Sequence, residues 1–161
     1  MSLEIEQHER FQRLEWAWER VGTALVTLFI LAGLLGLVAA GPLSWSSRSS
    51  ATEVVTVEFD RVIGHEADES ITLHFGPEAV VDGAITVELT GSWPGGISLQ
   101  GITPQPSEQR AVPDGMVLEI PVATAGTTEV SVSFRGQEYG TLDGELAVGD
   151  ESVSFSQFVT P

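Results

Sequence analysis

The feature that most limits the fold of this chain is a run of twenty residues without a charge, residues 21–40. At about 1.5 Å rise per residue, a helix of this length spans roughly 30 Å, which is the thickness of the hydrocarbon core of a bilayer. Eleven of the twenty are Leu, Ile, Val or Phe, and each favours insertion by about 0.3 to 0.6 kcal/mol at the helix centre. The run therefore predicts a transmembrane helix over residues 21–40.

A cleaved secretion signal is the alternative, because Val38 and Ala40 are small enough to precede a signal-peptidase cut. A signal normally has a short basic lead and an apolar stretch of about 7 to 15 residues. Here the apolar run is longer, and it follows twenty residues that contain five Glu. We therefore expect the helix to stay in the membrane as a signal-anchor.

The residues that flank the run agree with a membrane crossing. Trp16 and Trp18 precede it and Trp45 follows it, at the positions where amphipathic indoles settle in the two water interfaces. Gly41 and Pro42 end the predicted helix, because glycine supplies a left-handed cap and proline cannot continue the hydrogen-bond pattern.

Arginines set the expected orientation of the crossing. Three arginines precede the run and one follows it closely: Arg10, Arg13 and Arg20 against Arg48. Because only Lys and Arg count in this rule, the acidic residues before the run do not reverse it. We expect a single-pass membrane protein with a cytoplasmic N-terminus and an extracytoplasmic C-terminal domain.

Residues 1–20 are expected to form a cytoplasmic amphipathic helix, with acid-then-base pairs spaced four residues apart. Phe11, Leu14 and Trp18 fall on one face of this helix. Two interpretations stay open for it. The helix merely extends from the membrane, or its apolar stripe contacts the cytoplasmic surface of a partner.

A stripe of small residues lies within the predicted span, formed by Ala32, Gly36 and Ala40 at a spacing of four, with Gly33 beside them. Small residues at this spacing let a second helix approach closely in a bilayer. The stripe predicts an interface with an integral membrane partner or with a second copy of the chain.

The charge balance excludes several functions. The chain carries 7 Arg, no Lys, no Cys and 23 acidic residues, and 18 acids with 4 Arg lie after Gly41, so about −14 of the net −16 falls in the C-terminal part. This part repels phosphate backbones, which excludes nucleic acid, and it also repels anionic lipid headgroups. The absence of Cys excludes disulfides, metal thiolates and thiol catalysis.

Residues 41–51 are rich in serine and predict a flexible linker. Residues 52–159 then alternate short β-branched runs with turn residues, which predicts an antiparallel immunoglobulin-like β-sandwich, an all-β domain over residues 52–161. The eight predicted strands are 52–59, 70–75, 84–90, 97–102, 116–123, 128–134, 145–148 and 152–158.

Period-two alternation and turn chemistry add detail to the predicted sandwich. The residues expected inside are Val55, Val57, Phe59, Ile71, Leu73, Phe75, Phe134 and Phe155. Asp82-Gly83 and Gly149-Asp150 each predict a two-residue hairpin between flanking strands. Pro121 predicts an edge strand or a bulge, because proline lacks the N–H that a central strand needs.

No pattern predicts catalysis or a cofactor. The segment from His65 to Glu69, with His74 further on, fits no established metal-ligand spacing and is interpreted as a solvated hairpin turn. Serine catalysis lacks its usual motifs. Calcium on acidic loops is a minor alternative, and its candidate ligands are Asp143, Glu145, Asp150 and Glu151.

Two loops are candidates for contact with a partner. Trp93, in GSWPGG, is either an exposed anchor or a lid that folds back over one end of the sandwich. Residues 103–115 are predicted as the longest connection, and their prolines lower the entropic cost of binding. The candidate contact residues in that loop are Pro104, Pro106, Arg110 and Pro113.

FQRLEWAWERVG before the span, GPLSW after it and SFSQFVTP at the end resemble a group of small bacterial inner-membrane proteins without assigned activity. This resemblance implies a companion of a polytopic membrane protein, of the YetF kind, and implies no catalytic residue. The sequence thus predicts a non-enzymatic accessory subunit of a membrane complex. The alternative is an anchored extracytoplasmic module that binds a sugar, a peptide or calcium.

Overall fold

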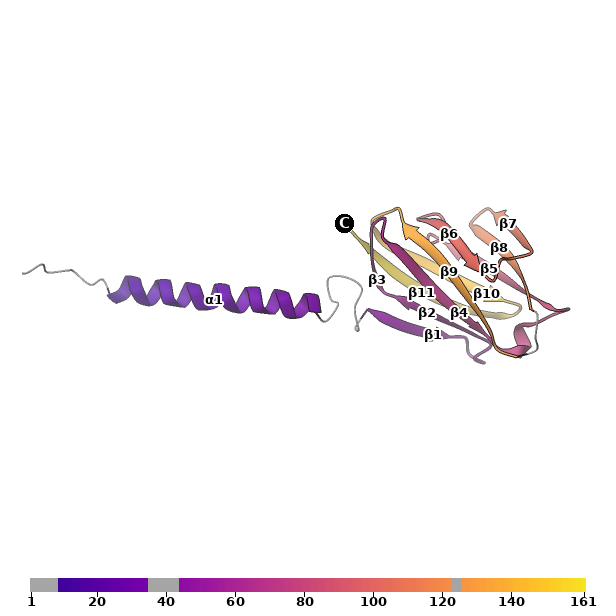
Figure 1. The fold of residues 1–161 in the computed structure, drawn as a ribbon, viewed down its shortest axis with the longest axis horizontal. Coiled ribbons are helices and arrows are strands. Elements are labelled where there is room, and N and C mark those ends of the chain that lie inside the picture. Colours follow the sequence, from indigo (N-terminus) through magenta and orange to yellow (C-terminus); the bar gives the residue numbers. More distant parts are fainter. Residues whose placement is uncertain (1–8, 35–43, 123–125) are drawn as a thin grey trace, which may run out of the picture.

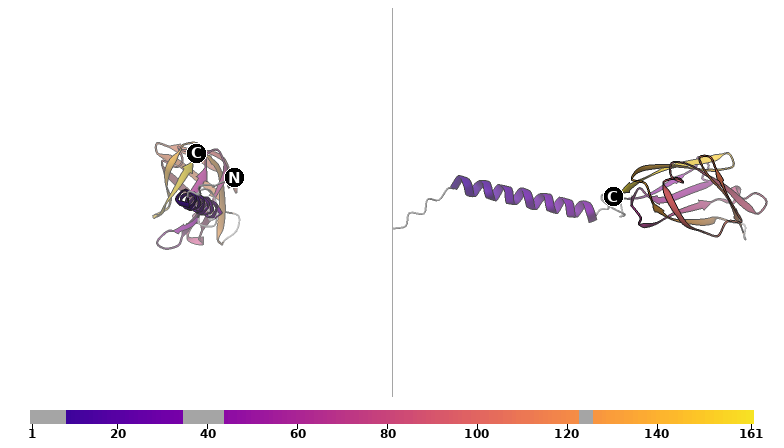
Figure 2. Two further views of the ribbon diagram at one scale, coloured as in Figure 1. Left: turned by 90° about the vertical axis from the view of Figure 1, so that its left-hand side faces the viewer. Right: turned by 90° about the horizontal axis from the view of Figure 1, so that it is seen from above.

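The computed structural model describes residues 9–34, 44–122 and 126–161, and in its helix it describes the side chains only from residue 16 onward. A long helix, α1 (Glu9–Leu34), precedes a β-rich domain (Figure 1, Figure 2). The stretch Trp16–Leu34 within α1 is long and apolar enough to cross a membrane, and none of it is buried against the rest of the chain. The predicted span continues to residue 40, so Gly36 and Ala40 lie outside the described residues, as do the Gly41-Pro42 stop and the side chains of Phe11 and Leu14.

The described strands form two sheets that face each other as a β-sandwich (Figure 1). The first sheet has the order β1 (Trp45–Ser49), β2 (Val55–Asp60), β4 (Asp68–Phe75), β9 (Thr128–Gly136) and β6 (Ile97–Thr103). The second has the order β3 (Val62–Gly64), β11 (Glu151–Thr160), β10 (Gly140–Val148), β5 (Ala84–Gly91), β8 (Gly115–Pro121) and β7 (Glu108–Val112). β3 pairs with β11 in parallel, and the other pairs are antiparallel. A short 3-10 helix, Pro77–Ala79, lies between β4 and β5.

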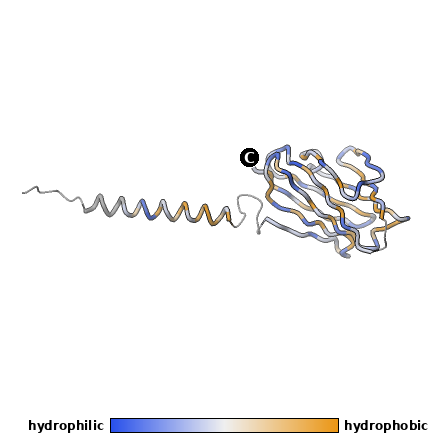
Figure 3. Tube along the Cα trace, in the orientation of Figure 1, coloured by the Kyte–Doolittle hydropathy of each residue, from blue (hydrophilic) through white to orange (hydrophobic). Residues whose placement is uncertain are grey.

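Alternating side chains build one core between the sheets. Along β2, β10 and β11, and along β4 from Ile71 onward, buried residues alternate with less buried ones. Figure 3 shows hydrophobic and hydrophilic positions interspersed along the strands. All eight residues expected inside are buried: Val55, Val57, Phe59, Ile71, Leu73, Phe75, Phe134 and Phe155. Period-two burial of β-branched and aromatic side chains therefore fixes which face of each strand points inward. The immunoglobulin-like assignment of the sandwich stays a prediction.

Each of the eight predicted strands overlaps an observed strand, and the described residues add three short ones, β1, β3 and β7. These three strands lie at or beside sheet edges. Their sequences, WSSRS, VIG and EQRAV, contain little apolar alternation. Edge strands bury fewer side chains, so the hydrophobic pattern does not reveal them.

The prediction that residues 41–51 form a flexible linker is wrong for residues 45–49. They form β1, which pairs in register with β2 from Trp45 opposite Asp60 to Ser49 opposite Thr56. Serine side chains replace apolar packing here, because the hydroxyl of Ser44 accepts from the Val62 N–H at 3.0 Å and donates to the Val62 carbonyl at 3.2 Å. A serine-rich segment thus joins the fold through hydrogen bonds instead of hydrophobic burial.

The two predicted tight turns have different outcomes. Gly149-Asp150 joins β10 to β11 as a two-residue hairpin, with Val148 opposite Glu151. Asp82-Gly83 forms a tight turn with both φ angles positive, at 53° and 82°. The predicted hairpin at Asp82-Gly83 is nonetheless wrong, because the turn leads from the 3-10 segment into β5, and β4 lies in the other sheet.

Two predictions about the proline-bearing segments are also wrong. Pro121 ends β8, which lies between β5 and β7 and is not an edge strand. The pairing of β7 with β8 stops at Glu119, so β7 does not need the N–H that Pro121 lacks. Residues 103–115 are not one long loop, because β7 occupies five of them.

Candidate binding groove

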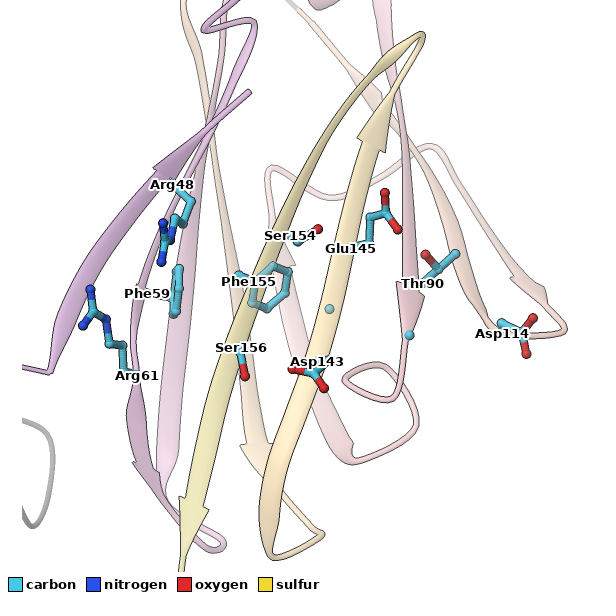
Figure 4. Close-up of a pocket in the computed structure, with 12 residues that line it drawn as sticks. Arg48, Phe59, Arg61, Thr90, Asp114, Asp143, Glu145, Ser154, Phe155 and Ser156 are labelled. Atoms are coloured by element: carbon cyan, nitrogen blue, oxygen red, sulfur yellow. The ribbon is translucent and has the colours of Figure 1, made fainter. Parts of the chain in front are cut away.

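A groove of about 960 Å³ crosses the outer face of the second sheet and ends against the β1–β2 edge of the first sheet (Figure 4). It is lined by two arginines, three carboxylates and several hydroxyls over a floor of two aromatic rings. The lining residues are Arg48, Phe59, Arg61, Thr90, Gly91, Asp114, Asp143, Gly144, Glu145, Ser154, Phe155 and Ser156.

Arg48 and Arg61 form one wall of the groove, on the β1–β2 side (Figure 4). Arg48 lies opposite Val57 in the β1–β2 ladder, two residues after Ser46, which is buried. Residues two apart on a strand share a face, so Arg48 projects toward the second sheet instead of away from the sandwich. Arg61 lies between β2 and β3, and its Nη2 donates to Ser46 Oγ at 3.2 Å.

The carboxylates of Asp143, Glu145 and Asp114 lie on the opposite side of the groove (Figure 4). Asp143 and Glu145 are two residues apart on β10, and both are exposed on the outer face of the sheet. Asp114 lies in the turn between β7 and β8, and its carbonyl accepts the Gly91 N–H at 3.1 Å. The groove therefore has a positive wall and a negative wall, each fixed by backbone pairing.

The floor of the groove is held by close packing around Gly144. Phe59 and Phe155 lie beneath it, with ring centroids 5.5 Å apart, and each is only 4% exposed. A Cβ atom at Gly144 would lie 2.5 Å from the ring of Phe155. Glycine at this position thus leaves the space that the Phe155 ring occupies beside β10.

This arrangement suits binding of a polar ligand that carries both signs of charge. The arginines offer donors for a carboxylate or phosphate, and the three carboxylates accept hydrogen bonds from amines or hydroxyls. Ser154, Ser156 and Thr90 add hydroxyls that both donate and accept. No histidine lies among the lining residues, so the serines of this groove have no imidazole base beside them.

The candidate calcium ligands do not gather into one site. Asp143 and Glu145 line the groove, whereas Asp150 and Glu151 lie at the β10–β11 turn, at the far end of the hairpin. In the part of the chain that the structure describes, no cluster of three or more His, Asp or Glu residues is arranged to hold a metal ion.

Trp93 is a core residue, so the prediction that it contacts a partner is wrong and the alternative that it folds back is confirmed. Its side chain is 0% exposed, and its Nε1 donates to Gln157 Oε1 at 2.6 Å. Its ring packs edge-on against Phe134 and Phe155, with centroid distances of 4.9 Å and 5.5 Å. Buried indole needs a partner for its N–H, and Gln157 supplies it.

The four candidate contacts of residues 103–115 are dispersed. Arg110 is exposed on the edge strand β7, and Pro113 is exposed in the turn after it, beside the groove residue Asp114. Pro104 and Pro106 are half-buried between β6 and β7. These residues do not form one contiguous surface with Trp93, because the indole lies inside the sandwich.

The segment from His65 to Glu69 connects the two sheets, so its interpretation as a hairpin turn is wrong. Asp68 and Arg135 form an exposed ion pair, with Arg135 Nε 2.6 Å from Asp68 Oδ1. The hydrogen bond and charge of this guanidinium lower the pKa of Asp68. Burial raises the pKa of the neighbouring Glu69.

The structure also shows the surroundings of His74 and of the helix residues that were predicted as contacts. His74 lies 3.6 Å from Glu58 on the neighbouring strand, and both side chains are about one third exposed, as expected for an outward position on β4. Trp18, Ala32 and Gly33 all lie on α1. Trp18 is exposed, and a Cβ atom at Gly33 would meet nothing within 4 Å.

Sequence reasoning missed the groove because its walls come from segments that lack a motif. Arg48 lies in the stretch interpreted as a linker, and Arg61 lies just after a strand, thirteen residues later. Only the antiparallel register of β1 with β2 brings them to one edge. The carboxylates on β10 carried a signal, the outward alternation of Asp143 and Glu145, but it indicated solvent exposure and not a site.

No protein-family model matches the chain, and no curated protein matches it. Among solved structures, the sulfur carrier protein SoxY from Chlorobium limicola f thiosulfatophilum is similar at 14% identity and a TM-score of 0.38, over 67% of this chain and 80% of that one. BslA, a bacterial hydrophobin, is similar at 16% identity and a TM-score of 0.39, over 71% of this chain and 98% of that one. Both TM-scores are below 0.5, so neither likeness bears on the function of this chain.

Proposed function

We propose that this protein is a non-enzymatic accessory subunit of a bacterial membrane complex, anchored by α1 and displaying its β-sandwich on the extracytoplasmic side. The observation that carries the proposal is the exposure of α1. From Trp16 to Leu34 no residue is buried against the sandwich, and the exposed side chains include Leu25, Phe29 and Leu34. Leaving such a side chain in water costs about 1.5 to 3 kcal/mol relative to burial, and a bilayer removes this cost.

The side chains at the start of the apolar stretch also support a membrane crossing. The guanidinium carbon of Arg20 lies 4.0 Å from the centre of the Trp16 ring. The hydroxyls of Thr23 and Thr27 each donate to a helix carbonyl four residues earlier at 2.8 Å. Both polar groups of the span are therefore satisfied within the helix, which is the condition for entering lipid.

The face of α1 that carries Ala32 and Gly33 is the proposed contact with the integral membrane partner. Because no side chain crowds Gly33, a second helix can approach the backbone there, and close packing drives helix association in lipid. Gly36 and Ala40 extend this face in the sequence. Phe11, Leu14 and Trp18 are the proposed contacts on the cytoplasmic side.

Purification of the full chain in a mild detergent, followed by mass spectrometry, tests this proposal. A polytopic membrane protein in a fixed ratio to the chain supports it, and a lone monomer contradicts it. Ala32→Ile should abolish the association by filling the small-residue face. Thr27→Ile is the matched control, because Thr27 lies about 140° around the helix from Ala32 at 100° per residue, and it should leave the complex intact.

The groove favours a second candidate function, an anchored module that binds a ligand. Its opposed Arg48–Arg61 and Asp143–Glu145 walls suit a short peptide, whose termini or side chains supply both charges. Thermal denaturation of the full chain with a panel of short peptides, oligosaccharides and calcium checks this candidate. A shift with peptides that Arg61→Ala removes supports it, and no shift across the panel contradicts it.

A further inference from the structure

The β-sandwich exposes aromatic side chains at one end. Among the described residues of the sandwich, the exposed large hydrophobic side chains are Trp45 (57%), Tyr139 (63%), Phe158 (48%) and Val81 (69%). The three aromatic ones share one end, where β1 begins, where β10 begins and where β11 approaches its last residue (Figure 1). We call this the tethered end, because the chain enters the sandwich there from α1. Val81 lies at the other end, before β5.

Hydrogen bonds make the tethered end rigid. The Arg61 N–H donates to the Ser44 carbonyl at 2.8 Å, and the Phe158 N–H donates to the Arg61 carbonyl at 2.7 Å. On the neighbouring segment the His65 N–H donates to the Thr160 carbonyl at 3.0 Å. The rings of His65 and Tyr139 stack with centroids 4.3 Å apart. Trp45 and Phe158 are therefore held on the paired strands β1 and β11, and Tyr139, in the short connection from β9 to β10, is held by its stacking on His65.

The length of chain before β1 places this end close to the proposed membrane span. If residues 21–40 cross the bilayer, five residue steps separate the end of the span from Trp45. A fully extended chain covers at most about 3.3 to 3.6 Å per residue, so Trp45 lies within about 18 Å of the end of the span. The headgroup region of a bilayer lies within this reach.

We propose that the tethered end is a membrane-contact surface, in which Trp45, Tyr139 and Phe158 insert into the headgroup layer and seat the sandwich on the bilayer. This inference rests on the proposed function, because it requires α1 to span the membrane. Trp and Tyr are favoured at this depth, where the ring is apolar and one edge is polar. The sandwich then lies against the membrane instead of standing off it.

Charges at the tethered end select the lipid. Asp60, Glu66 and Glu138 lie beside the aromatic residues, and Arg61 supplies a positive charge there. Anionic headgroups repel such an acidic surface, whereas zwitterionic headgroups do not. The proposed occupant of this surface is therefore a zwitterionic bilayer. The acidic domain is still expected to be repelled by anionic lipid headgroups.

Spin labels on single engineered cysteines test the inference, since the chain has no cysteine of its own. Full-length protein in phosphatidylcholine nanodiscs carries one label at one of three sites. These are Thr141 at the tethered end, Val81 at the other end of the sandwich, and Leu28 in α1. Accessibility to oxygen and to a water-soluble nickel chelate reports the depth of each label. We expect Leu28 in the lipid core, Thr141 in the headgroup layer and Val81 in water.

The outcomes separate this inference from the proposed function. Leu28 in lipid with both Thr141 and Val81 fully in water overturns the membrane-contact surface alone. Leu28 in water overturns the anchor and this inference together. Replacing all three aromatic residues by Ser should move the Thr141 label into water. Val81→Ser, measured with the same Thr141 label, should leave that label in the headgroup layer. An unchanged depth at Thr141 in the triple variant assigns the contact to other groups and overturns the role of the aromatic side chains.

The composition of the disc gives the last arm of the test. Nanodiscs of phosphatidylglycerol should move the Thr141 label toward water and leave the Leu28 label in the lipid core. Equal or greater depth at Thr141 in the anionic disc would contradict the zwitterionic preference.

Discussion

The indole of Trp93 and the side-chain amide of Gln157 meet inside the core, where Trp93 Nε1 donates to Gln157 Oε1 at 2.6 Å. The same amide donates through Nε2 to the carbonyl of Asp60 at 2.7 Å. Gln157 belongs to the second sheet and Asp60 to the first. One buried amide therefore ties the turn that carries Trp93 to both layers, at the end of the sandwich where β2 crosses into β3.

Loss of this indole hydrogen bond should destabilise the sandwich. Trp93→Phe keeps most of the apolar packing and leaves Gln157 Oε1 without its donor, which costs about 1 to 3 kcal/mol. Urea denaturation of the full chain in detergent micelles, followed by circular dichroism, measures the change. Trp45→Phe is the control, because Trp45 is exposed, and its effect should stay within about 0.5 kcal/mol. Equal effects of the two substitutions would contradict the role of the buried bond.

Ser44 is expected to stabilise the fold through its two bonds to Val62. Its side chain is buried, so Ser44→Ala leaves backbone groups of Val62 without a partner and costs about 1 to 3 kcal/mol. Ser47→Ala is the matched control, because Ser47 is an exposed serine three residues later, on β1. The same denaturation measurement checks both, and no loss with Ser44→Ala would mean that β1 contributes little to the sandwich.

Gly144 should tolerate no side chain. Gly144→Ala places a Cβ atom against the ring of Phe155, and overpacking of this kind costs about 1 to 3 kcal/mol. Gly95→Ala is the control, because the nearest atom to its Cβ is the Ser92 carbonyl oxygen at 3.8 Å. A smaller fall in the denaturation midpoint for Gly144→Ala than for Gly95→Ala would contradict the packing under the groove.

Glu69 and Asp68 should affect stability in opposite directions as pH changes. Burial raises the pKa of Glu69 in the folded state, so ionised Glu69 destabilises the fold at neutral pH, and stability is regained as pH falls through that raised pKa. Glu69→Gln should therefore raise the melting temperature at pH 7, and the gain should disappear in acid, where the wild-type carboxyl is protonated.

Asp68 supplies the comparison. The bond to Arg135 lowers its pKa in the folded state, so its stabilisation is present above its ordinary pKa and is lost as pH falls through the lowered one. Asp68→Asn should lower the melting temperature at pH 7 and have no effect below both pKa values. Melting temperatures of the three chains across pH 2 to 8 check both signs, in buffers of about 0.1 M ionic strength. A Glu69→Gln gain that persists at the acid limit would contradict the assignment to burial.

Hydrophobic periodicity predicted the strands whose side chains build the core. Val57, Leu73 and Val132 alternate with polar residues, and a shift by one position would turn them all outward, so the sequence specifies their faces. The same reasoning could not detect β1, β3 or β7, which pair through backbone and serine hydrogen bonds. Local composition predicts a linker at residues 41–51, because it carries no information about whether a neighbouring strand has an unpaired edge.

The groove was less predictable than the fold, because it depends on which distant segments become neighbours. Arg48 and Asp143 are 95 residues apart in the sequence and line one groove only because β1 and β10 lie in facing sheets. Predicting that Trp93 is buried would likewise require knowing which distant segments become its neighbours. Its partner Gln157 is a polar residue in an inward position of β11, which no apolar pattern reveals.

The most direct test of the central claim is the location of the sandwich in intact cells that make the full chain. A single cysteine at Val81, exposed on the sandwich, is treated with a membrane-impermeant maleimide in spheroplasts of a bacterial host, and the membranes are then washed with alkaline carbonate. We predict labelling without lysis, and a labelled chain of full length that stays with the membranes after the wash. Labelling only after lysis, or a shortened chain starting near residue 41 in the soluble fraction, would contradict a sandwich held outside by a retained helix.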